Sequence, residues 1–413
     1  MLWRLSQMQE ENQTMNSSSD FGCDVCVVGK GLLGSATARH LAEMDLNVLL
    51  LGPDEPSVKS QHSGVFGSHY DSGRITRIID TDLYCARIAE ASISRYRDLE
   101  ESSGIDFYQA VGHLAVSSAK DYIDEITNTA RQLKVDFESL TNPELLDAFP
   151  YFSFANEVSG IYEQFTGGYV NPRNLIKAQS EMVLKADGKI ITDTVSAIEK
   201  RKGFFEIFTE SGKKVRANQV LVACGVFSER LMPGGQNLDL EICESTVLLA
   251  ELSEENAMQL QEMPSLIFRY ESEIEKGVYL LPPIRYPDQK MYIKIGHSES
   301  RPMSDPATNL TKWFQGDGDQ AIGEWLHSQL FDLLPNVGLS NLKTESCAVS
   351  RSSTGRQFID VMDESGIHVL LAGNGYSAKS SDELGRITAH KIISGEVPDE
   401  YSDIDFTVKH KRT

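Results

Sequence analysis

Three glycines near the start of the chain have the spacing of a phosphate-binding loop. Gly29, Gly31 and Gly34 follow a short apolar run, and residues 35–44 after them have the pattern of a helix. In such a loop the backbone turns tightly and brings a pyrophosphate to the positive end of the helix. A second apolar run at 48–51 completes a strand–helix–strand unit. The sequence therefore predicts a dinucleotide site, although these glycines alone do not distinguish NAD from FAD.

The acidic residue that usually binds the ribose at the end of the second strand is missing. Leu51 is followed by Gly52, Pro53 and Asp54. Asp54 could take this role after a small shift in register, or backbone groups and water could replace the carboxylate. Both alternatives are open at this stage.

Two arginines three residues apart, Arg74 and Arg77, are candidates for binding an anion. They could line one side of a helical turn or straddle an extended segment. A guanidinium group binds a carboxylate through two parallel charge-assisted hydrogen bonds, which fix orientation as well as charge.

The elements that must position these residues come in two kinds. Nucleotide-domain segments lie at both ends of the chain, and strand-rich segments are inserted between them, including the alternating stretch 245–297. The expected fold is α/β with α+β insertions. Further helices are predicted at 84–101, 120–133, 142–149, 171–186, 318–333 and 380–393, with strands at 112–116, 194–198, 204–209, 213–215, 219–225 and 366–372.

Composition limits the class of protein. The 413 residues suffice for two domains, and 60 acidic against 39 basic side chains give a net charge of -21, which argues against nucleic acid as a partner. No stretch has the ~20 apolar residues of a membrane helix, so we expect no membrane partner. Six scattered cysteines and the absence of a signal peptide or a Ser-Lys-Leu terminus favour the cytoplasm. Residues 1–20 are expected to be a disordered polar tail.

Beyond the glycine loop, several separated motifs resemble those of one family. They are the segment 67–77, the strand-like segment 220–228, Cys347 followed by 358–360, and the glycine-rich segment 373–385. Over residues 22–397 the chain resembles the D-amino-acid-oxidase-like FAD-dependent oxidoreductases. Within them it is most similar to the monomeric sarcosine oxidases and N-methyl-amino-acid oxidases.

The resemblance implies a Rossmann-like FAD-binding domain interleaved with a sheet-based substrate domain. The FAD-binding domain would comprise 21–108, 165–242 and 345–397, and the substrate domain 109–164 and 243–344, with a C-terminal tail at 398–413. The cofactor-binding residues that it implies are Gly29, Gly31, Gly34, Ser68, Tyr70, Arg74, Ala223, Gly225, Cys347, Gly373 and Gly375. Cys347 would bind the 8-methyl carbon of the flavin covalently, which requires a thiolate. The resemblance implies no metal, and it favours a monomer.

The resemblance also implies catalytic roles for five residues. Arg74 would lie near the flavin ring, and Arg77 and Lys379 would bind a substrate carboxylate. Lys294 would activate molecular oxygen, because a fixed cation stabilises developing superoxide in a water-poor site. Tyr279 would shape the substrate pocket. The segment 380–382 (Ser-Ser-Asp) would cap the closing helix, whose N-terminus would face the flavin.

Some residues depart from the family pattern. Tyr70 and Ser298 stand where the family has histidines, and Phe227 stands where a tryptophan is common. The loop before Lys379 is one residue shorter than in typical sarcosine oxidases, which leaves the placement of this lysine open. A different or larger amine than sarcosine is therefore compatible with the sequence.

The resulting hypothesis is an FAD-dependent enzyme that oxidises a secondary amine or amino acid to an imine and reduces oxygen to hydrogen peroxide. Three alternatives stay open. One is a flavin dehydrogenase that uses a quinone or carrier protein, and the second is a non-catalytic flavin-binding assembly protein. The third is an NAD-dependent dehydrogenase, which would leave the second half of the flavin-binding pattern unexplained.

Overall fold

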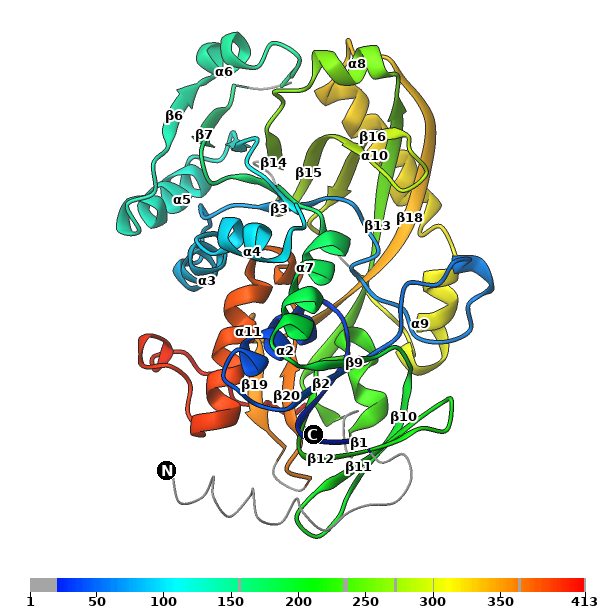
Figure 1. Cartoon of the computed structure of the whole chain (residues 1–413). Coiled ribbons are helices and arrows are strands. Elements are labelled where there is room, and N and C mark those ends of the chain that lie inside the picture. The colour runs from blue at the N-terminus through cyan, green and yellow to red at the C-terminus, as the bar shows by residue number, and fades with distance from the viewer. Residues whose placement is uncertain are drawn as a thin grey trace.

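The computed structural model describes residues 21–411 except 155–156, 233–236, 271–272, 300 and 363–364. The tail expected at 1–20 lies outside the described residues. The chain forms two large sheets and one small sheet, with helices packed against them (Figure 1). This is the α/β fold with sheet-rich insertions that the sequence predicts.

The first sheet contains the strand–helix–strand unit. Its strand order is β10-β11-β12-β1-β2-β9. β20 pairs with the end of β12, at Leu221 and Val222, along the edge that faces away from β1, and β20 also pairs with β19. The central strands β20, β12, β1, β2 and β9 run parallel, and β1 and β2 are apolar and largely buried, as expected for strands covered on both faces. The strands are β1 (Phe21–Val28), β2 (Val48–Leu51), β9 (Lys189–Ile191), β10 (Val195–Lys200), β11 (Phe205–Thr209), β12 (Lys214–Val222), β19 (Phe358–Val361) and β20 (His368–Leu371).

Helices cover the parallel strands. α2 (Leu32–Ala42) and α11 (Ser377–Ser394) pack closely, because a Cβ atom at Gly385 of α11 would lie 2.7 Å from the backbone of Ala36. The layer also includes α3 (Leu83–Ile93), α4 (Tyr96–Ser103) and α7 (Pro172–Lys185).

The second sheet has the order β17-β13-β16-β15-β14-β5-β7-β6, with β18 paired to β13. Its strands are β5 (His113–Ser117), β6 (Glu138–Thr141), β7 (Ser159–Glu163), β13 (Leu240–Leu252), β14 (Ser265–Tyr270), β15 (Glu273–Arg285), β16 (Met291–His297), β17 (Arg301–Pro302) and β18 (Leu339–Ser352). An apolar core fills the space between this sheet and its helices. The helices on this side are α5 (Lys120–Gln132), α6 (Asn142–Ala148), α8 (Glu254–Gln259), α9 (Pro306–Gln315) and α10 (Gln320–Leu333).

Two long strands connect the upper and lower parts of the molecule. β13 and β18 pair antiparallel from Leu240 with Ser352 to Leu252 with Leu339, and Figure 1 shows them running side by side. The domain boundaries expected after residues 242 and 344 therefore fall inside strands rather than in linkers. A continuous ladder of backbone hydrogen bonds couples the two parts, and the division into two domains stays a proposal.

A small third sheet lies between the two large ones. β3 (Arg74–Thr76), β8 (Gly168–Val170) and β4 (Tyr108–Gln109) form it in that order. Arg74 thus lies on an extended segment, which decides between the two arrangements considered for the arginine pair.

Three expected elements differ from the sequence prediction. The helix expected over 84–101 breaks at residues 94–95, where Arg95 pairs with Asp382 and Glu383 of α11. The closing helix begins at Ser377, so the expected capping segment 380–382 lies inside α11. The segment expected as a C-terminal tail packs against the first sheet and its helices. Tyr401 and Phe406 of this segment are buried in the same apolar core as β1 and α2.

Candidate active site

A cavity of about 1250 Å³ extends from the carboxyl ends of the parallel strands to the second sheet. Its wall includes Gly29 after β1, Ala223 after β12, Gly373 after β20, and Tyr279 and Cys347 from the second sheet. Ligands of open α/β sheets bind at this edge. The volume exceeds the roughly 300 to 1,000 Å³ of common small-molecule pockets, so a dinucleotide and a substrate can share it.

The glycine loop has the close backbone approach that a pyrophosphate site requires. A Cβ atom at Gly34 would lie 1.8 Å from the carbonyl oxygen of Gly29, and one at Gly29 would lie 2.3 Å from that of Ala223. The N-cap of α2, Gly31, has no side-chain cap, so the first amides of the helix are left for a ligand. These residues fit a dinucleotide.

Close packing against the glycine loop accounts for the absence of an acidic residue directly after β2. A Cβ atom at Gly52 would lie 2.5 Å from the backbone nitrogen of Lys30, so a side chain at 52 would displace the loop. The ammonium group of Lys30 forms an ion pair with Asp54 and donates to the hydroxyl of Thr192 at 3.2 Å. Asp54 thus lies beside the loop, and its contact with ribose stays a prediction.

The other residues that the resemblance assigns to the cofactor also line this cavity. The hydroxyl of Ser68 donates to the carbonyl of Ala348 at 2.7 Å, which fixes the loop before β3 against β18. Gly225 and Gly375 have φ angles of +55° and +79°, in the left-handed region that favours glycine. The cofactor residues that line the cavity are Gly29, Gly31, Ser68, Tyr70, Arg74, Ala223, Gly225, Cys347, Gly373 and Gly375, whereas Gly34 is buried in α2 and is not among the described residues of the wall.

Cys347 lies on β18, opposite Ser245 of β13, and is buried. Its sulfur is 3.6 Å from a guanidinium nitrogen of Arg74. The indole of Trp313 donates to the carbonyl of Cys347 at 2.7 Å and so holds this part of the strand. The sulfur thus lies on the cavity wall beside a cation.

The carboxylate of Asp71 bridges Arg74 and Lys294. Arg74 Nε is 2.9 Å from Asp71 Oδ2, and the ammonium group of Lys294 forms an ion pair with the same oxygen and donates to the carbonyl of Gly73 at 2.9 Å. The hydroxyl of Tyr286 donates to Oδ1 of Asp71 at 2.9 Å. Lys294 is fully buried, and it is not among the described residues that line the cavity.

The pKa values in this group follow from burial and pairing. Burial lowers the pKa of Lys294 to about 8, although Asp71 acts in the opposite direction. Burial acts to raise the pKa of Asp71, but Lys294 and Arg74 overcome it and hold this pKa below its usual range. Asp71 is therefore ionised.

Asp80 bridges the other arginine and the other lysine. Arg77 and Lys379 donate to Asp80 Oδ2 at 3.0 and 2.7 Å. Both cations line the cavity. The structure thus brings together the two residues expected to bind a substrate carboxylate, with a carboxylate of the protein already between them.

Tyr279 separates Lys294 from the cavity. Its ring lines the wall, with the Lys294 ammonium 5.7 Å from the ring centroid, and burial raises the pKa of its hydroxyl well above the ordinary value. Ser298 lines the cavity as well, and its hydroxyl donates to the carbonyl of Gly277 at 3.2 Å.

Asp71 and Asp80 were missed by the sequence reasoning. They lie three residues before Arg74 and three residues after Arg77. The spacing is a detectable signal, since Asp and Arg three residues apart can pair. The third member of each group comes from a distant strand or helix, which local spacing does not indicate.

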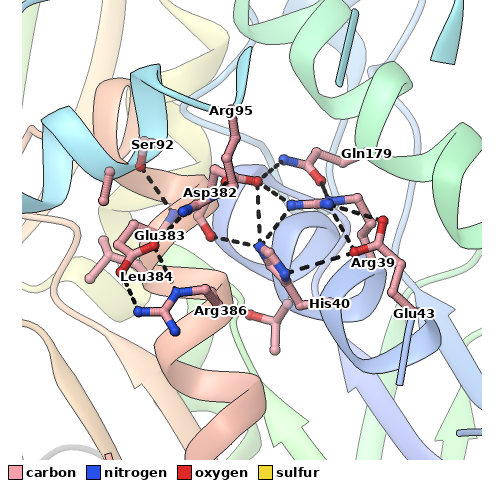
Figure 2. A network of polar contacts seen from close by, with 12 residues as sticks. Arg39, His40, Glu43, Ser92, Arg95, Gln179, Asp382, Glu383, Leu384 and Arg386 are labelled. Carbon is pink, nitrogen blue, oxygen red and sulfur yellow. Dashed lines mark hydrogen bonds and ion pairs between the residues drawn. The ribbon is translucent and has the colours of Figure 1, made fainter. Parts of the chain in front are cut away.

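A buried ionic network fixes the helix that carries Lys379. Asp382 of α11 accepts hydrogen bonds from Arg39 of α2 at 2.5 Å, Arg95 at 2.6 Å and Gln179 of α7 at 3.0 Å (Figure 2). Asp382 is 1% exposed. The network ties α11 to the helix that begins at the glycine loop, so the two walls of the cavity are held in a fixed relation.

The fold and site define a flavoprotein-like oxidoreductase, with a dinucleotide cradle at one end of the cavity and paired cations at the other. The chain belongs to the DAO family of FAD-dependent oxidoreductases, whose family model matches residues 24–391. The resemblance noted from the motifs is thereby confirmed, and with it the dependence on FAD.

Individual relatives agree with this assignment. The chain is 22% identical to N-methyl-L-tryptophan oxidase of Yersinia pestis (strain Pestoides F) over 381 residues, which cover 89% of this chain and 94% of that protein. NikD, an amino acid oxidase of nikkomycin biosynthesis, superposes in its open form with a TM-score of 0.76 at 19% identity, covering 95% of this chain and 99% of NikD. L-proline dehydrogenase from P. horikoshii gives a TM-score of 0.73 at 13% identity, covering 94% and 97%.

Described residues form no helix with the length and apolarity that a membrane span requires.

Proposed function

We propose that the chain oxidises the carbon–nitrogen bond of a small amine or amino acid with FAD bound in the cavity, and that molecular oxygen accepts the electrons. One observation carries the proposal: Gly29 and Gly31 of the glycine loop, Cys347 and the cation pair Arg77 and Lys379 all line a single cavity. The sequence relative named for N-methyl-L-tryptophan oxidation supports the same class of reaction.

The reaction balances as two half-reactions. The amine loses two electrons and two hydrogens, one from carbon and one from nitrogen, and becomes an imine, which water hydrolyses to a carbonyl compound and an amine. Oxygen gains two electrons and two protons and becomes hydrogen peroxide. FAD, when bound, supplies the two-electron acceptor that no side chain can provide.

The residues of the chain bind and orient the cofactor and the substrate, and they enclose the substrate. The loop at Gly29 and the N-terminus of α2 hold the pyrophosphate, and Tyr279 forms a wall of the substrate pocket. Arg74 remains cationic beside Cys347, since Asp71 raises its pKa against the lowering effect of burial. A fixed positive charge at this end of the cavity favours negative charge that develops during the reaction.

We further propose that Cys347 forms a thioether with the 8-methyl carbon of the flavin. The thiol and the methyl group each lose one hydrogen, and oxygen takes the two electrons. The position of the sulfur on the cavity wall and its contact with Arg74 support this bond. We expect flavin mass on the Cys347 peptide, and free flavin after acid denaturation of C347S. Free flavin from the unmodified chain would exclude the bond.

A dehydrogenase is the second candidate, and the placement of Lys294 favours it. This lysine is paired with Asp71 and lies under Tyr279, so its charge is withdrawn from the cavity. If Lys294 is the cation that the reaction with oxygen requires, this placement slows that reaction, and the electrons pass to a quinone or a carrier protein instead. The solved structure of L-proline dehydrogenase shares this fold.

The two candidates are separated by one experiment on the holoenzyme. Secondary amines and amino acids are added without oxygen, and loss of flavin absorbance identifies a substrate. Air is then admitted. Recovery of the absorbance with one peroxide for each substrate supports the oxidase. Recovery only with an artificial quinone supports the dehydrogenase, and no loss with any amine contradicts both.

We also propose a monomer in a reducing compartment such as the cytoplasm. The six cysteines are all free thiols in the structure. Size-exclusion chromatography with light scattering checks the oligomeric state, and a mass of two chains would contradict the proposal.

A further inference from the structure

We propose that Asp80 takes the place of a substrate carboxylate at Arg77 and Lys379, so that the cavity selects amines that carry no carboxylate beside the nitrogen. The inference rests on the proposed function, because it specifies the substrate class for the same cavity. It departs from the relatives of the chain that are named for oxidation of amino acids.

The contacts of Asp80 are those of a bound carboxylate. It is 6% exposed, and its Oδ2 is shared by the guanidinium group of Arg77 and the ammonium group of Lys379, which is 2% exposed. Charge-assisted hydrogen bonds of this kind, away from water, are among the strong ones. An incoming carboxylate would share both cations with Asp80 and lie close to its negative charge.

The local charge is already balanced without a ligand. Two cations, Arg77 and Lys379, lie near two carboxylates. Asp80 pairs with both cations, and the charge of the buried Glu163 also raises the pKa of Arg77. Glu163 is held behind the site by the backbone amides of Ile78 and Ile79, each donating at 3.0 Å. A third carboxylate would leave a net negative charge in a buried cluster, which is costly in a medium of low polarity.

The surroundings of Lys379 lower the pKa of its ammonium group. Burial lowers its pKa, and Arg77 adds to this effect, while Asp80 acts in the opposite direction. The ion pair with Asp80 therefore supports the charge of Lys379.

Other cations on the described wall are also partnered. Lys30 pairs with Asp54, Arg74 with Asp71, and the guanidinium of Arg230 lies 4.9 Å from the ring centroid of Phe227. Arg269 and Arg351 have interactions of their own. At Lys30 and Arg74, as at the pair Arg77 and Lys379, a substrate carboxylate would therefore have to compete with a carboxylate of the protein.

The first test uses the unmodified holoenzyme and two substrates that differ only in the carboxylate. These are N-methyl-L-tryptophan and N-methyltryptamine, with N-methylglycine and its amide as a smaller pair. We expect kcat/KM to be at least about 10-fold higher for the carboxylate-free member, in proportion to one charge-assisted interaction. A preference of the same size for the carboxylate would overturn the inference and leave the proposed function standing.

The second test frees the two cations. D80N keeps the shape of the side chain and removes its charge, and we expect it to raise kcat/KM for the carboxylate-bearing member about 10- to 100-fold. The matched control is D82N, because Asp82 lies two residues away, caps α3 and pairs with Arg356 rather than with the cation pair. A D80N variant that loses activity with the carboxylate-bearing member would show that Asp80 positions the cations for this ligand, which overturns the inference.

Binding provides a readout that needs no turnover. Indole-3-acetate is titrated into each holoenzyme by calorimetry, and we expect D80N to bind it at least about 10-fold more tightly than the unmodified chain and D82N do. Equal or weaker binding by D80N overturns the inference. If no amine is oxidised, the proposed function fails and this titration still decides the role of Asp80. If D80N does not fold, the ratios measured on the unmodified chain decide it.

Discussion

Charge pairing at the residue scale distinguishes this cavity from a simple carboxylate site. Asp71 and Asp80 each join one arginine of the segment 74–77 to one distant lysine, Lys294 or Lys379. Each carboxylate keeps its cations ionised at a buried position, where an unpaired charge would be costly. The same pairing reduces the attraction that the cations exert on a ligand.

A buried histidine beside the cation pair gives a pH-dependent prediction. Burial, with Arg77 and Lys379 adding to it, holds the pKa of His113 well below its ordinary value, and its Nδ1 is 2.9 Å from the hydroxyl of Ser265. Below about pH 6.5 the unfolded chain takes up a proton at this position and the folded chain does not. Stability should therefore fall with decreasing pH, by up to about 1.4 kcal/mol per pH unit from this histidine.

Urea unfolding of the unmodified chain and of H113Q between pH 7.5 and pH 5.5 checks this prediction. The variant will be less stable at every pH because it loses the contact with Ser265, but its stability should change less steeply with pH. Parallel pH profiles of the two chains would show that His113 does not contribute.

The glycine loop is an element whose geometry leaves no room for a side chain. G34A places a methyl group against the carbonyl of Gly29, so we expect the loop to shift and FAD affinity to fall at least about 10-fold. The measurement is the flavin-to-protein absorbance ratio in the C347S background, which lacks the proposed thioether, after free FAD has been removed by dialysis. G22A serves as the control, because a Cβ atom there would meet nothing within 4 Å. Full flavin content in G34A would contradict the role of the loop.

The ionic network of α11 sets the position of a helix. D382N removes the buried charge that Arg39 and Arg95 share, although Arg95 keeps its ion pair with Glu383, and we expect a loss of about 3 to 5 kcal/mol in the free energy of unfolding. E125Q, at an exposed position of α5, should change the free energy by less than about 0.5 kcal/mol. Chemical denaturation of both variants checks this, and similar midpoints would show that the network is dispensable.

Elements with a strong periodic pattern were predictable from sequence, and their ends were less so. The pattern from 120 to 133 matches α5, and the predicted meander matches β10 to β12. The segment Ser-Ser-Asp at 380–382 reads locally as a helix cap, yet Asp382 is used inside the helix because two arginines from other elements reach it. Tertiary pairing of this kind overrides the local capping preference.

The candidate site was predictable where a motif is local. Gly29 and Gly31 of the glycine loop line the cavity as predicted, and so do Ser68, Tyr70, Arg74 and Arg77 of the segment 67–77. The position of Lys294, paired with Asp71 and next to Tyr279, was not predictable from sequence. It depends on the orientation of Asp71, which is set by its contacts with Tyr286 and Arg74. Such arrangements arise from packing between distant segments.

The whole molecule combines a cofactor cradle in one sheet with a substrate wall in another. β13 and β18 of the second sheet run side by side toward the lower part of the molecule (Figure 1), and Cys347 of β18 lines the cavity. This architecture requires a dinucleotide flavin for function, since the catalytic side chains themselves carry no redox group.

The absorption spectrum of the purified chain, recorded directly and after reconstitution with FAD, tests this requirement most directly. The account predicts the two visible bands of oxidised flavin at about one flavin per chain. A chain that stays colourless after reconstitution would contradict the assignment of the cavity to FAD, and with it the proposed oxidation of a carbon–nitrogen bond.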